Sequence, residues 1–555
     1  MPSSPSRPSG ARRRSFAAPP PIVCLALSAV LACSPGDGPA EEEAAEQLGT
    51  VHLPVSCGAT ADEALERGLA LLHHMTYEPA EAAFAEAADA NPDCALAHWG
   101  EAMTFVHPLW SDPPTAEKFD RGVEALAAAR AVDDATEVER AYVEAVGAYF
   151  DTGRQAEERP NLEAFATGWE EAHEAFPDDP EIRAFHALSI LGVADPGDEE
   201  LEAQRRAGAL AEELLEEHPE HPGAHHYAIH AYDYPALAER ALPVARSYGE
   251  IAPSVPHALH MPTHIFTRLG LWDASIDFNE RSAEAARENP VNGAVSLHFF
   301  HALDYLAYAH LQRAEWDAAR AVLDTVRSVE GPMMVEVATP YTLAAVPARF
   351  ALEREAWATA AALPAAVPAD YPWEQFPAIE AISHFARGIG AARNDDAVAA
   401  RASVERLAEL RDAAAATSSY WADQVEIQRL AVEAWAEHAA GSAEAGLATM
   451  RRAAELEAST EKHPVTPGEV LPARELLGDM LLDLERYEEA EAAYAAALER
   501  SPRRLRSLYG AGRAAELAGD DASAAEWYGQ LVELTADGDR TAERIRRARE
   551  FVADS

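Results

Sequence analysis

The chain has 555 residues, with 45 Lys or Arg against 94 Asp or Glu, so its formal net charge is -49. This acidic excess disfavours binding to nucleic acid or to anionic lipid headgroups, both of which need a basic surface, and we expect no nucleic-acid partner. Ala-rich stretches with a period near 3.6 residues run through most of the chain and strand-like alternation is rare, so we predict an all-α protein.

The N-terminal segment 1–33 has the pattern of a secretory signal peptide with a lipobox. Three consecutive arginines precede an apolar run, Ile22 to Leu31, and Cys33 follows it. A run of about ten apolar residues is too short to cross a bilayer as a helix. We therefore expect Cys33 to carry a lipid and residues 34–56 to form a disordered acidic tether. The protein would then be held on the periplasmic side of a bacterial envelope by this anchor alone, or else be secreted.

The first predicted helix pair spans residues 64–92, where small, apolar and aromatic residues alternate at helical spacing, namely Gly68, Leu71, Ala80, Phe84, Ala87 and Pro92. Cys57 and Cys94 each precede the first helix of consecutive pairs, which places them at the same end of adjacent helices. In an oxidising compartment we expect a disulfide between them. The alternative is two unpaired, half-buried thiols.

Histidines concentrate between residues 218 and 310, which hold 11 of the 21 His in the chain. His226 and His230 are four residues apart, as are His260 and His264, so each pair shares one face of a helix. The two pairs are 34 residues apart, which is also the repeat period near the C-terminus. We therefore expect the pairs to lie side by side on adjacent helices.

The next helix of this block carries His301 and Asp304. Alignment through Trp316 places His301 level with His257, and Asp304 level with His260. Simple counting at the repeat period gives a different register. We prefer the Trp-based alignment, because a long helix or loop shifts a simple count.

Four imidazoles and a carboxylate on neighbouring helices have the composition of a site for a divalent first-row transition metal, Zn first. The candidate ligands are His226, His230, His260, His264, His301 and Asp304. No HExxH sequence is present, so no zinc-protease general base is built in, although Asp233 or Asp304 could orient a ligand imidazole. The alternative interpretation is that these histidines pack in narrow seams between helices.

The C-terminal part contains the most regular repeat. Residues around Gly478 recur around Gly512 after 34 residues, and the best matches lie within 471–537. The chain here resembles a tetratricopeptide repeat (TPR), a helix–turn–helix unit. The resemblance implies an α-solenoid of stacked antiparallel helix pairs, a right-handed superhelix whose concave groove is lined by the first helix of each pair. The His block would then face that groove.

Three segments follow from this interpretation. We expect an N-terminal TPR-like solenoid with the His-rich groove over residues 57–362, a Pro-rich break over 363–377, and a C-terminal TPR-like solenoid over 378–553. From Cys57 onward the chain also resembles a family of bacterial secreted or lipid-anchored TPR proteins of poorly defined function. That resemblance rests on the segments around both cysteines, on the His block and on residues 463–469 (HPVTPGE).

Two hypotheses of function remain open. The first is a non-enzymatic, lipid-anchored scaffold that binds a protein or peptide in its concave groove. The second is a metal-binding protein or metal-dependent hydrolase that uses the His and Asp cluster. No phosphate-binding glycine loop and no GxSxG nucleophile elbow is present, so no catalytic residue is assigned.

Overall fold

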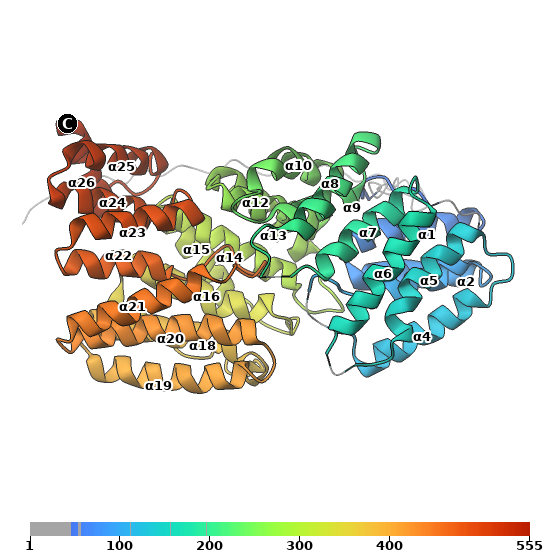
Figure 1. Cartoon of the computed structure of the whole chain (residues 1–555), viewed down its shortest axis with the longest axis horizontal. Helices are drawn as coiled ribbons and strands as arrows, with labels where there is room; N and C mark the ends of the chain where they lie inside the picture. Colours follow the sequence, from blue (N-terminus) through green and yellow to red (C-terminus); the bar gives the residue numbers. More distant parts are fainter. Residues whose placement is uncertain (1–45, 54–56, 111–112, 156, 196) are drawn as a thin grey trace, which may run out of the picture. The chain divides into compact units, whose positions relative to one another are not determined.

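The computed structural model describes residues 46–53, 57–110, 113–155, 157–195 and 197–555 (Figure 1). Within these ranges the regular structure is helical, and the extended pairings are two isolated bridges, Val291 with Ala294 and Val295 with Met333. The all-α prediction is confirmed. Across the same ranges, no helix is both long enough and apolar enough to cross a membrane.

The helices of the first half pack against their neighbours in succession, and their order in the chain is largely their order in space. They are α1 (Ala59–His73), α2 (Tyr77–Ala90), α3 (Ala95–Met103), α4 (Ala116–Arg130), α5 (Glu137–Asp151), α6 (Arg159–Ala175), α7 (Pro180–Gly192), α8 (Glu202–Glu217), α9 (Pro222–Tyr232), α10 (Ala238–Ile251), α11 (Pro256–His260), α12 (Pro262–Arg268) and α13 (Trp272–Glu288).

The second half continues in the same way, and Figure 1 shows α18 to α23 lying side by side. Its helices are α14 (Leu297–Gln312), α15 (Trp316–Ser328), α16 (Ala338–Leu352), α17 (Trp357–Ala361), the short η1 (Trp373–Gln375), α18 (Pro377–Arg393), α19 (Ala397–Ala414), α20 (Ser419–Ala439), α21 (Ala443–Ala458), α22 (Ala473–Asp483), α23 (Tyr487–Arg500), α24 (Leu505–Ala518), α25 (Asp521–Leu534) and α26 (Glu543–Asp554).

The small-residue pattern that indicates the repeat acts through close helix contacts. Tyr494 on α23 lies between Gly478 on α22 and Gly510 on α24, and a Cβ at either glycine would come within 2.7 Å and 2.3 Å of the ring. Phe84 on α2 lies between Gly68 and Gly100 in the same manner. The aromatic ring of one helix thus fills the space left by a glycine on the helices before and after it. The TPR-like stacking of helix pairs is therefore present at both ends of the array.

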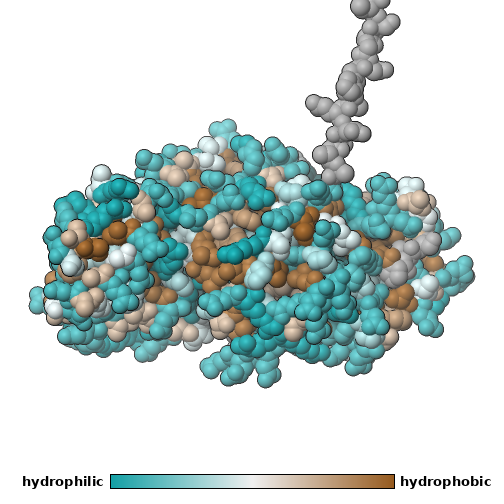
Figure 2. All heavy atoms as spheres, turned by 90° about the horizontal axis from the view of Figure 1, so that it is seen from above, coloured by the Kyte–Doolittle hydropathy of each residue, from teal (hydrophilic) through white to brown (hydrophobic). Residues whose placement is uncertain are grey.

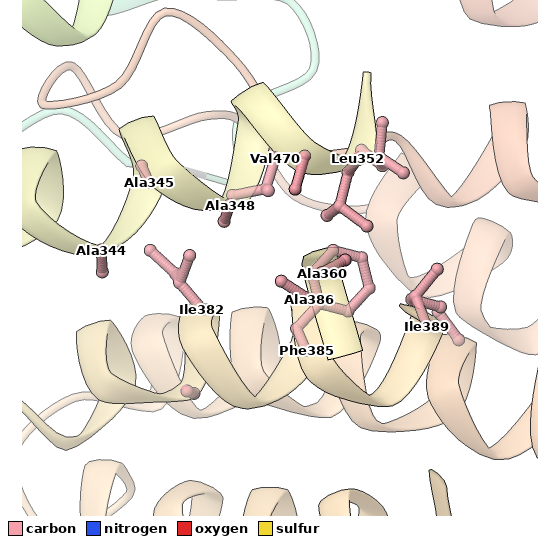
Figure 3. Close-up of a cluster of buried hydrophobic side chains, with 14 of the residues drawn as sticks. Ala344, Ala345, Ala348, Leu352, Ala360, Ile382, Phe385, Ala386, Ile389 and Val470 are labelled. Carbon is pink, nitrogen blue, oxygen red and sulfur yellow. The ribbon is translucent and has the colours of Figure 1, made fainter. Parts of the chain in front are cut away.

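The predicted break at 363–377 does not divide the hydrophobic core. Side chains on α16 and α17, which precede it, pack in one cluster with those of α18, which follows it. Figure 3 shows Leu352 and Ala360 close to Phe385 and Ile389 in this cluster. Leu363 and Trp373, within the segment itself, belong to the cluster too. Because its apolar residues are buried, the segment is an irregular connection inside a continuous core.

Part of the expected tether is ordered. Leu48 is buried, the Thr50 N–H donates to the carbonyl of Glu220, and the His52 N–H donates to Glu181. The prediction of a disordered tether over 34–56 is therefore wrong for residues 47–53. The physical reason is that Leu48, Val51 and Leu53 pack with the hydrophobic core of the N-terminal helices. The remainder of the tether, apart from Glu46, and the whole signal segment with Cys33 lie outside the described residues.

Cys57 and Cys94 form the expected disulfide, with their Cα atoms 5.4 Å apart. Cys94 is the residue before α3 and Cys57 lies just before α1, so the bond joins the starts of two neighbouring first helices. Hydrophilic residues cover much of the face in Figure 2, in keeping with the acidic composition, and hydrophobic residues gather toward its middle.

Candidate metal centre

The His block folds into four helices that meet at one place. His226 and His230 lie on α9, His257 and His260 on α11, His264 on α12, and His298 and His301 on α14. Pro262 begins α12 directly after α11 ends, because a proline at the first position of a helix costs no hydrogen bond. Nearly all of these imidazoles are buried; His230 and His298 are partly exposed.

Three of these histidines form a compact set that we call the first imidazole group: His260, His264 and His301. One ring nitrogen of each lies within 4.8 Å of one nitrogen of the others. The rings of His260 and His301 are 4.1 Å apart between centroids, and Tyr305 packs against all three. Within the part of the chain that the structure describes, Nδ1 of His301 has no hydrogen-bond partner. Three imidazoles gathered in this way have the composition of a zinc site with three protein ligands and one further position.

The hydrogen bonds behind the first imidazole group fix which nitrogen of two rings carries the proton. Nδ1 of His264 lies 2.9 Å from a carboxylate oxygen of Asp233, so this nitrogen donates. Nδ1 of His260 lies 2.8 Å from Oδ1 of Asn279. The Asn279 amide nitrogen donates to the carbonyl of Ser275 at 2.7 Å, which leaves its oxygen to accept from His260. Both rings therefore carry Nδ1–H.

The consequence is that the lone pairs of two ring nitrogens face each other, which is unfavourable. Nε2 of His260 and Nε2 of His264 are only 3.1 Å apart, and neither carries a proton when both rings are neutral. A proton shared between them is disfavoured, because burial holds the pKa of His260 well below its ordinary value and also lowers that of His264. A metal cation between the two nitrogens satisfies both, and oriented imidazoles of this kind are typical of metal ligands.

The charges beside the first imidazole group are balanced. Asp233 accepts from His264 and pairs with Arg268 at 2.8 Å and Lys462 at 3.1 Å, while Arg268 also pairs with Glu461 at 2.8 Å. Burial alone would raise the pKa of Asp233, but the two cations hold it well below its ordinary value. Two cations and two carboxylates leave no net positive charge to repel a metal.

Residues 459–472, between α21 and α22, cover the His block. Lys462 reaches Asp233, and Tyr305 donates to the carbonyl oxygens of Pro464 and Thr466 at 3.1 and 3.0 Å. Arg349 on α16 donates to Thr466 and to the carbonyl of Gly468. The expectation that the His block faces an open groove is therefore wrong. A long connection from the C-terminal repeats packs over it instead.

The predicted ligands divide into two sets and one outlier. The second imidazole group consists of His226, His230 and His257, whose nitrogens also lie within 4.8 Å of one another. The two predicted His pairs are neighbours, since the rings of His230 and His264 are 6.4 Å apart. Asp304 belongs to neither group, because it forms an ion pair with the buried Arg349. The prediction that Asp304 is a metal ligand is therefore corrected.

The predicted alignment of the helix that carries His301, made through Trp316, is also wrong, by about one helical turn. His301 lies beside His260, and His298 lies beside His257 at 4.9 Å. The extra residues of this repeat are spread over its elements: α13 has 17 residues where α23 has 14, and α14 has 16 where α22 has 11. Neither an alignment through one Trp nor counting at a fixed repeat period allows for residues added both before and after His301.

Sequence reasoning did not identify three residues that shape the site. His257 completes the second imidazole group, Asn279 orients His260, and Lys462 pairs with Asp233. His257 stands in the same HxxH segment as His260, which was an available signal. Asn279 lies on the following helix among polar residues, and Lys462 is about 230 positions from Asp233, so no local pattern marks either of them.

Comparison with known proteins identifies no family. No protein-family model matches the chain, and no curated protein matches it. Among solved structures, Naa15/Naa10 bound to HypK-THB is 12% identical, covers 89% of this chain and 74% of its own, and has a TM-score of 0.23. The human IFIT1 dimer with PPP-AAAA is 12% identical over 86% of this chain and 91% of its own, with a TM-score of 0.36. Likeness at this level carries no inference about ligand or activity.

Proposed function

We propose that this protein binds a divalent first-row transition metal, Zn²⁺ first, through His260, His264 and His301. The observation that carries the proposal is the 3.1 Å approach of two Nε2 atoms whose rings both carry Nδ1–H. Such an approach is repulsive without a cation and favourable with one. Three neutral imidazoles suit Zn²⁺, Cu²⁺, Ni²⁺ and Fe²⁺ better than the oxygen-seeking Mg²⁺ and Ca²⁺. No catalytic step forms part of the proposal.

Metal analysis of protein made without a His tag tests this proposal directly. We expect stoichiometric transition metal in the purified protein or after incubation with Zn²⁺, and at a hundredfold excess over Kd a gain of about 2.7 kcal/mol in the free energy of unfolding. Less than about 0.2 equivalents of any transition metal, with no shift in melting temperature on adding Zn²⁺, contradicts it.

Substitution of His264 by Ala separates binding from packing. If His264 binds metal, the loss of melting temperature appears mainly in the metal-loaded protein. If it only packs, metal-free and metal-loaded samples lose the same amount. His384→Ala on α18 is a matched control, because that imidazole lies near Glu380 and belongs to neither imidazole group. The control should leave the metal content unchanged.

A lipid-anchored scaffold that binds a protein or peptide is the second candidate, favoured by the stacked helix pairs. A hollow of about 730 Å³ beside Leu53, Phe176 and His218 offers such a partner an apolar and polar lining. The anchor is tested by expressing the full chain and Cys33→Ala in a bacterial host that processes lipoproteins. Membrane fractionation should show the unaltered chain bound and the variant released. Equal release of both overturns the anchor.

A further inference from the structure

The second imidazole group has the features of a separate metal site. Nδ1 of His226 donates to the carbonyl of His73 at 2.7 Å, so its Nε2 is left to bind. That Nε2 lies 3.1 Å from Nε2 of His230. His226 and His230 are one turn apart on α9, which is the spacing at which two helical histidines share a metal.

His257 supplies the strongest indication. The residue is 3% exposed, and among the described residues neither of its ring nitrogens has a hydrogen-bond partner. It stands between His226 and His298, each 4.9 Å away between ring centroids, with Trp110 packed against it at 5.6 Å. A buried polar group left unpaired loses its hydrogen bonds to water without replacement, which destabilises the folded state. Coordination of one nitrogen to a metal would remove half of this deficit.

A third cluster of potential ligands differs from the second imidazole group, because its ring nitrogens already have hydrogen-bond partners. Nε2 of His73 lies 2.7 Å from Glu181, and its Nδ1 lies 2.9 Å from the Tyr227 hydroxyl. His221 accepts from the Ala224 N–H at 3.1 Å and donates to Glu181 at 3.2 Å. All four ring nitrogens have partners, so a metal here would have to break existing bonds. In the second imidazole group a metal would displace the 3.1 Å contact between Nε2 of His226 and Nε2 of His230, while His257 has no hydrogen bond to give up among the described residues.

We infer that the His block is a two-metal centre, in which His226, His230 and His257 bind a second divalent transition metal beside the first. This inference rests on the proposed function, because it extends the same cluster of imidazoles. The two groups are neighbours: the rings of His257 and His260 are 6.4 Å apart, as are those of His230 and His264. His230 is partly exposed, which gives this site a route to solvent.

The stoichiometry of the full chain tests the inference. Metal-free protein without a His tag is titrated with Co²⁺, followed by its visible absorption, and bound Zn²⁺ is counted by elemental analysis after gel filtration. We expect two equivalents for the unaltered protein. His257→Leu and His301→Leu should each retain one equivalent, and each should lose about half of the Co²⁺ absorption of the unaltered protein, because both sites offer three imidazoles.

Each outcome has one meaning. One equivalent in the unaltered protein, kept in His257→Leu and lost in His301→Leu, overturns the second site and leaves the proposed function standing. No bound metal in the unaltered protein overturns both. If His257→Leu fails to fold, His230→Gln replaces it, since that side chain is partly exposed. Retention of two equivalents in His230→Gln counts against the second site, and His384→Gln serves as the control that should keep both metals.

Discussion

Substitution of Gly510 by Ala tests whether glycine–aromatic contacts hold consecutive helices together. The new Cβ would lie 2.3 Å from the Tyr494 ring, more than 1 Å closer than ordinary contact allows. The ring cannot retreat, because Gly478 leaves it only enough space for a hydrogen atom on the other side and its hydroxyl bonds to Asp479. Over-packing of this kind costs about 1–3 kcal/mol. Ala gains about 1 kcal/mol of helix propensity over Gly, so we expect a net loss of about 1 kcal/mol.

Gly529→Ala is the matched control. Gly529 lies inside α25, and a Cβ there would meet nothing within 4 Å. The control should therefore gain up to about 1 kcal/mol from helix propensity alone. Urea unfolding followed by circular dichroism measures both changes, and hydrogen exchange over α23 and α24 shows where the first variant opens. If Gly510→Ala gains stability as Gly529→Ala does, the packing argument is refuted.

Three further predictions follow from the described contacts. Burial would raise the pKa of Glu475, but Arg504 and Arg506 hold that pKa at about 2, against the ordinary 4.5. The ionised carboxylate therefore stabilises the fold above pH 4.5, and this stabilisation is lost as the pH falls toward 2. Glu475→Gln should flatten the pH dependence of urea unfolding between these two values. Replacing both Cys57 and Cys94 by Ser should lower the free energy of unfolding by roughly 3–4 kcal/mol, and an unchanged urea midpoint would contradict a stabilising bond. Asn279→Ala should weaken Zn²⁺ binding about 10–100-fold in chelator competition, because His260 loses the side chain that orients its ring. An unchanged affinity would show that this hydrogen bond does not matter for binding.

The repeated pattern in the sequence predicts the helices well because each repeat is a local unit. Gly478 and Tyr494 are 16 residues apart, and their contact depends only on one helical hairpin. The same holds for the His pairs, whose four-residue spacing places two imidazoles on one face whatever surrounds them. The disulfide was predictable for a related reason, since Cys57 and Cys94 begin successive first helices.

The rest of the site depends on contacts that no local pattern encodes. Asp304 could be placed on the correct helix, but its partner Arg349 lies 45 residues later, on a helix of the following repeat. Lys462 arrives from a connection whose path is decided by where α21 and α22 stack. Leu48 and the residues after it appeared to belong to the polar tether, because the acidic stretch before them hides the change to apolar composition.

Arg504 gives the array a property that simple repeat arrays lack. Its buried guanidinium bonds to Glu475 in the adjoining repeat, but also to Glu353 and Tyr308, 151 and 196 positions earlier. In a linear array each unit responds only to the next, and end units can be removed one at a time. Here the loss of α24 together with Arg504 would remove a partner from one carboxylate, Glu353, and one phenol, Tyr308, far back in the polypeptide. Shortening the protein from its C-terminal end should therefore disrupt its middle as well.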